Sequence, residues 1–266
     1  GKIIHVSMPT LPFDQARAMV EREVCAARPA PPVERVTLAD AAGRVLAETV
    51  AADRDYPPFD RSTRDGYAVR AAETPGRLRV IGQVRAGQEF RDAVGPGEAI
   101  EIMTGAPVPE GVDAVVMVEH TRREGGLVAT ERGVRAGENI VPRGSEGASG
   151  APALEPGLRL DYPEIALLAS FGRDPVTVYG RPRVAILPTG DEVVEISQAP
   201  SSCQIRNSNA YSLAAQVRRA GGEPVVLPIA PDEPARTREL IEQGLQNDLL
   251  LLSGGVSMGQ YDLVED

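Results

Sequence analysis

The chain is poor in the residues on which several common classes of protein depend. Among its 266 residues there are no tryptophans, two cysteines and two histidines, and aromatic residues make up 4%. The two cysteines, Cys25 and Cys203, lie too far apart to form a zinc-ligand pattern or a disulfide framework. The sequence therefore favours a reduced, cytoplasmic protein whose cores consist of Val, Leu, Ile and Ala.

Basic residues and long apolar runs are also scarce. The net charge is −10, which argues against a general nucleic-acid binder because such proteins present a basic face. No apolar run approaches the roughly 18–20 residues that cross a membrane. The first ten residues, GKIIHVSMPT, are too polar for a signal peptide. We expect a soluble globular protein of about two domains or more that binds neither nucleic acid nor a membrane.

Hydrophobic periodicity changes along the chain. Residues 12–27 carry apolar residues at a spacing of three and four, which predicts a helix. Residues 77–143 alternate short apolar runs with Gly and Pro, which predicts a β-rich unit with many turns. Residues 160–172 predict a short helix that ends at Gly172.

After residue 181 strands and helices alternate. Apolar runs at 183–188, 223–229 and 249–252 are separated by two helical patterns, and this order is typical of a doubly wound parallel sheet. Continuous apolar runs fit strands that helices cover on both faces, so we expect Leu249–Leu252 to be buried. Ligands of such sheets bind beyond the carboxyl ends of the strands.

Three loops follow those strand ends: 188–192, 230–234 and 253–262. The last, SGGVSMGQYD, contains glycines and serines that could bring backbone N–H groups close to a phosphate, although a turn without a ligand has the same composition. Three carboxylates, Glu192, Asp232 and Asp262, with Asp191 as a fourth candidate, could hold Mg²⁺. The alternative is that these acids cap helices or stabilise their first turns.

Polar loops also interrupt the first half of the chain. They contain Asp65 in PPFDRSTRDGYA, Thr104 in a Thr-Gly-Ala-Pro turn, and Glu146 in residues 139–147. From the residues alone the first segment is better interpreted as an exposed loop that joins two domains, and the other two can be an ordinary β-turn and a linker. Neither histidine has a partner at catalytic spacing, and no Ser-His-Asp or Cys-His pattern is present.

Six segments in order resemble the molybdopterin molybdenumtransferase family, which includes MoeA and the E domain of gephyrin. They are PPFDRSTRDGYAVR, IEIMTGAPVPEGVDAVVMVE, GENIVPRGSEG, RPRVAILPTGDEVVE, IRNSNAYSLAAQV and SGGVSMGQYD. The resemblance extends from about Leu11 to Asp266, and it implies that the family's C-terminal part is missing.

The resemblance implies a multidomain α and β fold with three parts. These are an elongated mixed linker domain at 7–52 and 148–179, a β-rich inserted domain at 53–147, and a doubly wound α/β molybdopterin-binding domain at 180–266, incomplete at its C-terminus. It also implies a homodimer in which the α/β domain of one subunit faces the β-rich domain of the other. A molybdopterin-adenylylating protein and chaperones of molybdenum enzymes are implied partners.

The implied activity is insertion of molybdenum from molybdate into molybdopterin-adenylate, with Mg²⁺ as cofactor and release of AMP. A non-catalytic molybdopterin carrier or scaffold is the alternative, and a molybdopterin-adenylylating enzyme is a third reading, against which the long β-rich insertion argues. The implied catalytic residues are Asp65, Thr104, Glu146, Glu192, Asp232 and Asp262. Glu192, Asp232 and Asp262 are the implied metal ligands. The expected cofactor-binding residues are Ser253, Gly254, Gly255, Ser257, Thr189, Gly190, Asn207 and Ser208.

Three residues depart from the family's pattern. Arg61 stands where Asn is usual, Arg64 where a hydrophobic residue is usual, and Glu146 where Asp is usual. The two arginines could strengthen the binding of an oxyanion or change its specificity, and the longer glutamate side chain could weaken a geometric role.

Overall fold

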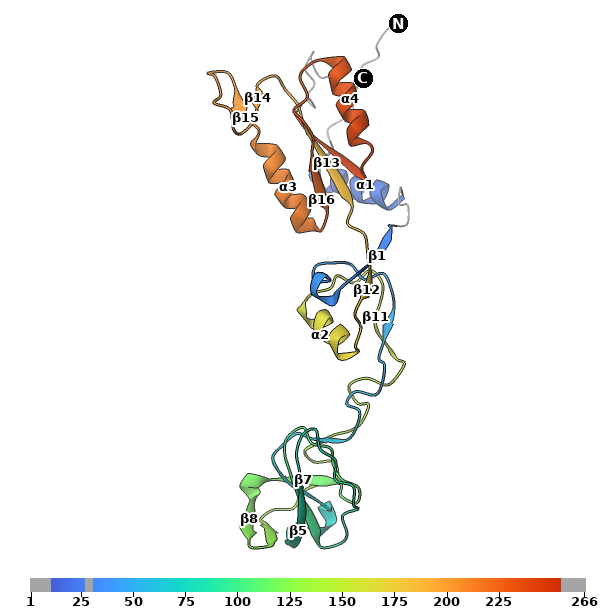
Figure 1. Cartoon of the computed structure of the whole chain (residues 1–266), viewed down its shortest axis with the longest axis vertical. Helices are drawn as coiled ribbons and strands as arrows, with labels where there is room; N and C mark the ends of the chain where they lie inside the picture. The colour runs from blue at the N-terminus through green and yellow to red at the C-terminus, as the bar shows by residue number, and fades with distance from the viewer. Residues whose placement is uncertain (1–10, 27–30, 255–266) are drawn as a thin grey trace. The chain divides into compact units, whose positions relative to one another are not determined.

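The computed structural model describes residues 11–26 and 31–254. The chain divides into two compact units (Figure 1). Unit 1 comprises Gly1–Ala47 and Pro175–Asp266, and unit 2 comprises Glu48–Asp174. Unit 2 is therefore inserted into the sequence of unit 1. The three-domain division expected from the sequence stays a prediction. In the described ranges, no helix combines the length and the apolar character needed to cross a membrane.

The N-terminal part of unit 1 contains a helix and a two-stranded ribbon. Helix α1 spans Phe13–Ala26, as the periodicity predicts, but its side chains are almost all exposed. Strand β1 (Val33–Val36) pairs antiparallel with β12 (Val176–Tyr179). The short 3₁₀ helix η1 (Leu38–Asp40) follows β1. Buried Arg44 forms an ion pair with Glu34 and donates to the Tyr179 carbonyl, which ties this ribbon together.

A three-stranded parallel sheet forms the centre of the C-terminal part of unit 1. Strand β13 (Arg183–Pro188) lies between β16 (Glu223–Val226) and β17 (Leu249–Ser253). Alternate side chains of β13 point to opposite faces. Ile186 packs against α3 (Ser208–Ala220), and Leu187 packs against α4 (Pro234–Gly244). Figure 1 shows these two helices on either side of the strands. The predicted strand–helix alternation is confirmed.

Strand β17 is less buried than its four leucines predict. Leu251 contacts the cluster on the α3 side, and Leu250 and Leu252 contact the cluster on the α4 side. However, Leu249 is 46% exposed, and the other three leucines are half-buried. The expectation of complete burial is therefore wrong for this strand, because β17 is an edge strand of the described sheet.

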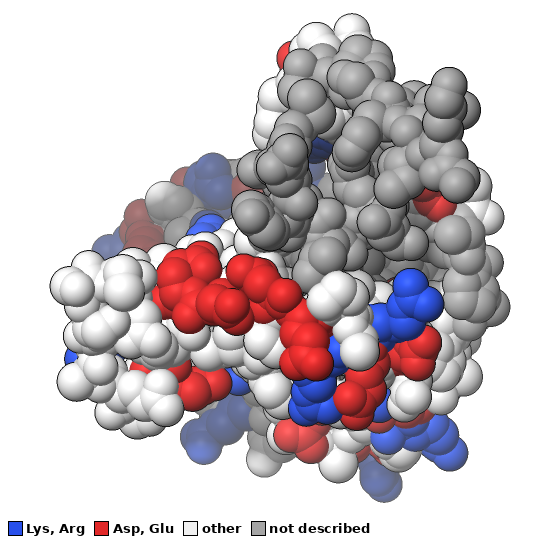
Figure 2. Space-filling model, turned by 90° about the horizontal axis from the view of Figure 1, so that it is seen from above, with Lys and Arg blue, Asp and Glu red and all other residues white. Residues whose placement is uncertain are grey.

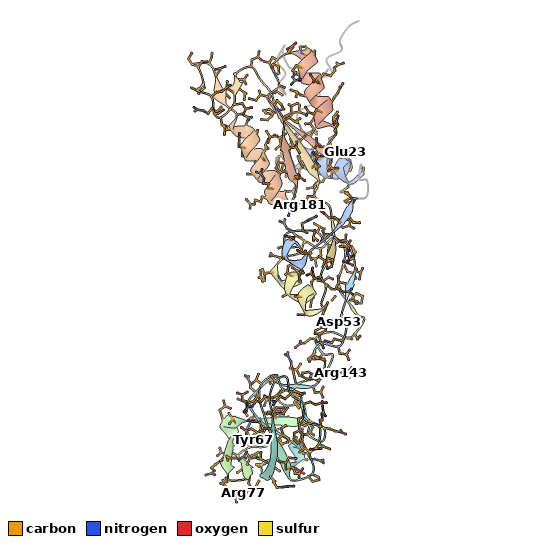
Figure 3. The ribbon with its side chains drawn as sticks, in the orientation of Figure 1. Glu23, Asp53, Tyr67, Arg77, Arg143 and Arg181 are labelled. Atoms are coloured by element: carbon orange, nitrogen blue, oxygen red, sulfur yellow. The ribbon has the colours of Figure 1, made fainter. Side chains whose placement is uncertain are left out.

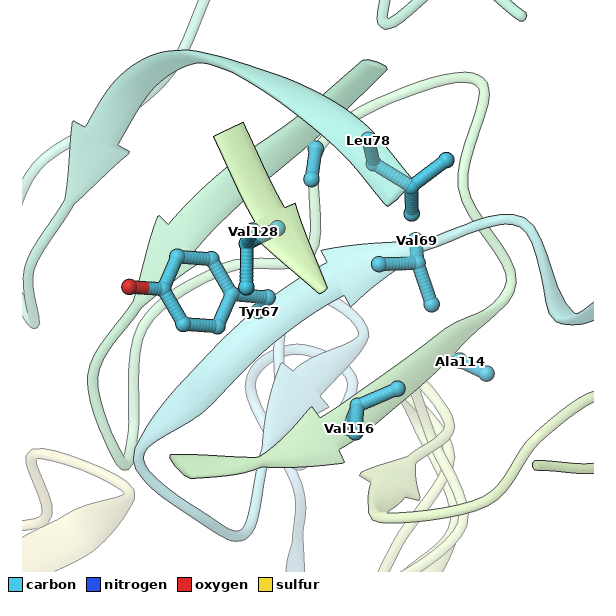
Figure 4. Close-up of a cluster of buried hydrophobic side chains, with 7 residues drawn as sticks. Tyr67, Val69, Leu78, Ala114, Val116 and Val128 are labelled. Atoms are coloured by element: carbon cyan, nitrogen blue, oxygen red, sulfur yellow. The ribbon is translucent and has the colours of Figure 1, made fainter. Parts of the chain in front are cut away.

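Most of unit 2 is a six-stranded sheet in the order β7-β4-β6-β5-β9-β8. Its strands are β4 (Gly66–Val69), β5 (Arg77–Val84), β6 (Glu98–Ile102), β7 (Ala114–Met117), β8 (Thr121–Glu124) and β9 (Leu127–Thr130). All pairs are antiparallel except β5 with β6. One face buries Tyr67, Val69 and Leu78 with four smaller apolar side chains (Figure 4). The core is thus built mainly from aliphatic residues, as the composition predicts.

Shorter elements complete unit 2. Strand β2 (Val50–Ala51) pairs with β11 (Pro152–Leu154), and β3 (Arg61–Ser62) pairs with β10 (Ile140–Val141). Helix α2 (Tyr162–Ser170) begins at a capping box that Asp161 and Glu164 form. Two 3₁₀ helices, η2 (Ala71–Glu73) and η3 (Val118–His120), flank strands of the sheet.

Candidate functional site

The carboxyl ends of the three parallel strands meet at one edge of the sheet in unit 1. The backbone N–H of Thr189 donates to the Ser253 carbonyl at 3.0 Å, and that of Gly190 donates to the Ala230 carbonyl at 3.1 Å. The Ala230 N–H in turn donates to the Pro188 carbonyl at 2.8 Å. These bonds hold the end of β17 and the loops after β13 and β16 together where the sheet topology predicts a ligand.

Two of the predicted glycines have backbones that other residues rarely adopt. Gly190 has φ +123°, and Gly254 has φ +104°. A Cβ on Gly254 would lie 2.7 Å from the Thr189 carbonyl oxygen, closer than real Cβ contacts allow. Glycine at 254 therefore lets the backbone directly after β17 approach Thr189 closely.

A pocket of about 100 Å³ opens at this edge. Six of the residues predicted as catalytic or cofactor-binding line it, namely Thr189, Glu192, Asn207, Ser208, Ser253 and Gly254. The other lining residues are Pro188, Val193, Ile205, Arg206 and Asn209. Gly255, Ser257 and Asp262 lie outside the described residues. The pocket therefore gathers most of the expected cofactor-binding set that the structure describes, and it adds Arg206, which sequence reasoning missed.

Asn207 links the pocket to helix α3. Its Oδ1 accepts the N–H of Ala210 at 3.2 Å, so the side chain acts as the N-cap. Its backbone N–H donates to Val194 in the short strand β14 (Val193–Val194), which pairs parallel with β15 (Ile205–Arg206). Asn207 is only 4% exposed. The cap therefore fixes the first turn of α3 against the pocket.

The acidic residues of this edge are not equivalent. Glu192 lines the pocket, whereas Asp191 accepts the backbone N–H of Asp232 at 3.0 Å and so holds the loop after β16. The N-cap position of α4 is Glu233, and its side chain makes no capping hydrogen bond. Capping therefore does not account for the side chain of Asp232, which is exposed.

The positions of the acidic side chains bear on the predicted magnesium site. Within residues 11–26 and 31–254, no group of three or more His, Cys, Asp or Glu side chains is close enough to hold a metal ion. Figure 2 shows a row of Asp and Glu side chains on the face that it displays. Glu192 and Asp232 offer the hard oxygen donors that Mg²⁺ prefers, but the third predicted ligand, Asp262, lies outside the described residues. The magnesium site stays a prediction.

A second set of predicted residues meets within unit 2. The Asp65 Oδ1 accepts both the backbone N–H and the hydroxyl of Thr104, each at 2.7 Å. These two hydrogen bonds hold the pKa of the Asp65 carboxyl below its ordinary value of 3.8, and the bond from the Thr104 backbone N–H has the larger effect. Asp65 is therefore an ionised acceptor at neutral pH, and Thr104 is held in one orientation by it.

Removing the Thr104 hydroxyl tests this assignment. We expect Thr104→Val to raise the pKa of Asp65 towards its ordinary value, because one of the two hydrogen bonds to the carboxylate is lost. Since the folded pKa is depressed, the stabilisation is present above the unfolded pKa and is lost as the pH falls through the folded pKa. NMR titration of the Asp65 carboxyl carbon measures the shift, and an unchanged pKa would contradict the assignment.

Glu146 occupies a different environment from Asp65. Its Oε1 accepts from the Arg61 Nη2 at 2.7 Å. The loop around it is fixed by Arg143 (Figure 3), whose Nε donates to Asp55 and whose backbone N–H donates to Asp60, both at 2.7 Å. Arg61 and Glu146 are thus two departures from the family's pattern that contact each other.

Two family models match successive parts of the chain. Residues 11–172 match the MoeA N-terminal region (domain I and II), and residues 185–266 match a probable molybdopterin binding domain. The chain belongs to the MoeA family. The resemblance and the multidomain α and β fold class expected from the sequence are confirmed.

Several relatives define the chain's place in the MoeA family. A protein from Nostoc named molybdopterin molybdenumtransferase is 40% identical over 87% of this chain. A protein of the same name from Bacillus subtilis is 38% identical over 96% of this chain. The solved MoeA protein of Pyrococcus horikoshii OT3 is 32% identical over 92% of this chain, with a TM-score of 0.83. This chain spans 55% of the Nostoc protein, 61% of the Bacillus protein and 67% of the Pyrococcus chain.

Proposed function

We propose that this protein acts in molybdenum cofactor biosynthesis by inserting molybdenum from molybdate into molybdopterin-adenylate, with release of AMP. The observation that carries the proposal is the pocket at the carboxyl edge of the parallel sheet, within the part that matches a molybdopterin binding domain. The curated relatives named molybdopterin molybdenumtransferase support the same reaction. We further propose that the protein is cytoplasmic and works as a homodimer, and the exposed apolar side chains of α1 support self-association.

The proposed reaction breaks the bond between the adenylate phosphorus and the oxygen of the molybdopterin phosphate. When water attacks the phosphorus, the bonding electron pair returns to the molybdopterin phosphate, and AMP leaves with the oxygen of that water. When a molybdate oxygen attacks instead, the first product is adenylyl-molybdate, and water then cleaves it to AMP and molybdate. The two dithiolene thiols of molybdopterin then bind the metal, and their protons leave with displaced molybdate oxygens as water. The protein needs to supply no covalent group in this scheme, so positioning and charge stabilisation dominate.

The chain's own residues would contribute in two ways. The pocket would hold the ligand through backbone amides and through the side chains of Asn207 and Ser208. Glu192 and Asp232, with Asp262, would hold Mg²⁺, which neutralises phosphate charge when it is bound. Asp65 accepts two hydrogen bonds and stays ionised, so we assign it a positioning role towards Thr104 and not that of a proton donor.

A single-turnover assay tests the proposal. The protein is mixed with molybdopterin-adenylate, molybdate and Mg²⁺, and AMP is followed by chromatography. We expect AMP release that depends on molybdate and stops when the divalent cation is chelated. Tight binding of molybdopterin-adenylate without AMP release would refute the enzymatic proposal and leave a molybdopterin carrier or scaffold.

A further inference from the structure

The pocket in unit 1 has one positive side chain that no prediction from the sequence used. Arg206 is the last residue of β15 and directly precedes the N-cap of α3. Among the described lining residues, Arg206 and Glu192 are the only two that carry charge. They form no ion pair with each other, since the described ion pairs include neither of them. The lining of the pocket therefore includes two charges of opposite sign that do not neutralise each other by direct contact.

Most of the Arg206 guanidinium is uncommitted. The Arg206 Nε donates to the Gln198 carbonyl at 3.2 Å, and this hydrogen bond holds one edge of the guanidinium in place. Within the described part of the chain, neither Nη atom has a hydrogen-bond acceptor. Guanidinium groups bind phosphate oxygens through parallel N–H donors, and this geometry favours arginine at phosphate sites. Arg206 is thus anchored at one nitrogen and free to bind an anion with the other two.

Asn207 provides a second, independent donor beside Arg206. The Asn207 Oδ1 accepts the capping hydrogen bond from the Ala210 N–H. Because the accepting atom must be the oxygen, the other atom of the amide is the nitrogen, Nδ2. The Nδ2 amide donates to no acceptor among the described residues, although the side chain is 4% exposed and lines the pocket. Since Asn207 lines the pocket and its Nδ2 has no acceptor among the described residues, a ligand in the pocket can accept from Nδ2.

The start of α3 adds donors of the same kind. Ser208 and Asn209 also line the pocket. The first N–H groups of a helix have no carbonyl partner within it, and the helix dipole favours negative charge there. Arg206, Asn207 and Ser208 thus bring a cation, an amide and a hydroxyl-bearing residue to the lining of one small pocket.

We propose that Arg206 and Asn207 bind a phosphate group of the pocket's ligand at the N-terminus of α3. This inference rests on the proposed function for the identity of the ligand, and it goes further by naming the residues that hold its phosphate. The phosphate could belong to the molybdopterin side chain or to the adenylate, and these two sources share the same chemistry.

Binding of simple phosphate esters separates these sources without requiring turnover. The probes are AMP with adenosine, and 6-hydroxymethylpterin phosphate with 6-hydroxymethylpterin, titrated by calorimetry. We expect at least one ester to bind about tenfold more tightly than its alcohol, because hydrogen bonds to a charged group are the strong ones. A preference for AMP assigns the adenylate phosphate, and a preference for the pterin ester assigns the molybdopterin phosphate.

Substitution of Arg206 tests the residue itself. Arg206→Ala should weaken binding of the preferred ester by about tenfold and leave its alcohol unchanged, and Arg206→Lys should have an intermediate effect. The matched control is Arg219→Ala, which removes the same charge from the last turn of α3 and should change the dissociation constant less than about twofold. Circular dichroism and thermal unfolding verify that the variants are folded.

Two outcomes would overturn the proposal. One is that Arg206→Ala and Arg219→Ala weaken ester binding equally, and the other is that neither ester binds better than its alcohol. These outcomes differ from failure of the proposed function. If the protein releases no AMP from molybdopterin-adenylate, the proposed function fails, but Arg206→Ala can still weaken ester binding and so support the phosphate site.

Discussion

Gly66→Ala is expected to destabilise unit 2 by about 3 kcal/mol, at the upper end of the usual cost of overpacking. Gly66 begins β4, an interior strand of the six-stranded sheet, and it pairs with Met117 on one side and Ile102 on the other. A Cβ at this position would lie 1.9 Å from the Val116 carbonyl oxygen. Because the clash is with backbone, β4 and β7 must separate to relieve it, and ladder hydrogen bonds weaken as a result.

Denaturant unfolding measures the effect, and Gly126→Ala is the matched control. Gly126 precedes β9 in the same sheet, its φ lies outside the left-handed region, and no atom lies within 4 Å of the added Cβ. We expect this control to change the free energy of unfolding by less than about 0.5 kcal/mol. Equal stability of the two variants would contradict the close packing of β4 against β7.

Asp232→Ala is expected to lower the rate of AMP release by about 100-fold, the order of magnitude seen when a charge-stabilising group is removed from an active site. The side chain of Asp232 is exposed, and its backbone N–H, which Asp191 binds, is kept in the variant. The substitution should therefore leave the fold unchanged. Rapid-quench single-turnover kinetics at saturating molybdopterin-adenylate measure the effect on the chemical step.

The neighbouring residue supplies the control for this prediction. Glu233→Ala removes a carboxylate one position along the same loop, from the N-cap of α4, where the side chain forms no capping hydrogen bond. We expect its rate to stay within about threefold of the wild-type rate, in line with the small effects of surface charges. If both variants lose activity equally, the general negative charge of the loop is responsible and Asp232 has no specific role.

The long elements could be predicted from the sequence because local pattern and tertiary environment agree. The helices at α1, α2, α3 and α4 and the apolar strands β5 and β13 fall where periodicity and turn residues place them. The strand β8 was missed, because its residues Thr121–Glu124 are polar and charged, and an edge strand does not need an apolar pattern. The two-residue strands β3, β10, β14 and β15 were also missed, because only pairing with another segment defines them.

The candidate site, too, could be predicted from the sequence only in part. The strand-end rule located the edge where Thr189, Glu192 and Ser253 meet, because this rule depends only on the order of elements. Arg206 was not predicted, because it comes before a helix and reaches the pocket only through the pairing of β14 with β15. The ion pair of Arg61 with Glu146 joins residues 85 positions apart, and no local pattern reports such a contact.

The insertion of unit 2 into unit 1 has a consequence for the order of events during synthesis. Strand β1 leaves the ribosome long before its partner β12, because residues 48–174 are made between them. The start of this insert is bound to its later part, because β2 pairs with β11, the Thr49 hydroxyl donates to Glu155, and the Tyr56 hydroxyl donates to the Ser170 carbonyl near the end of the insert. Once the insert has folded, it therefore acts as a short bridge, which lowers the entropic cost of bringing β12 back to β1.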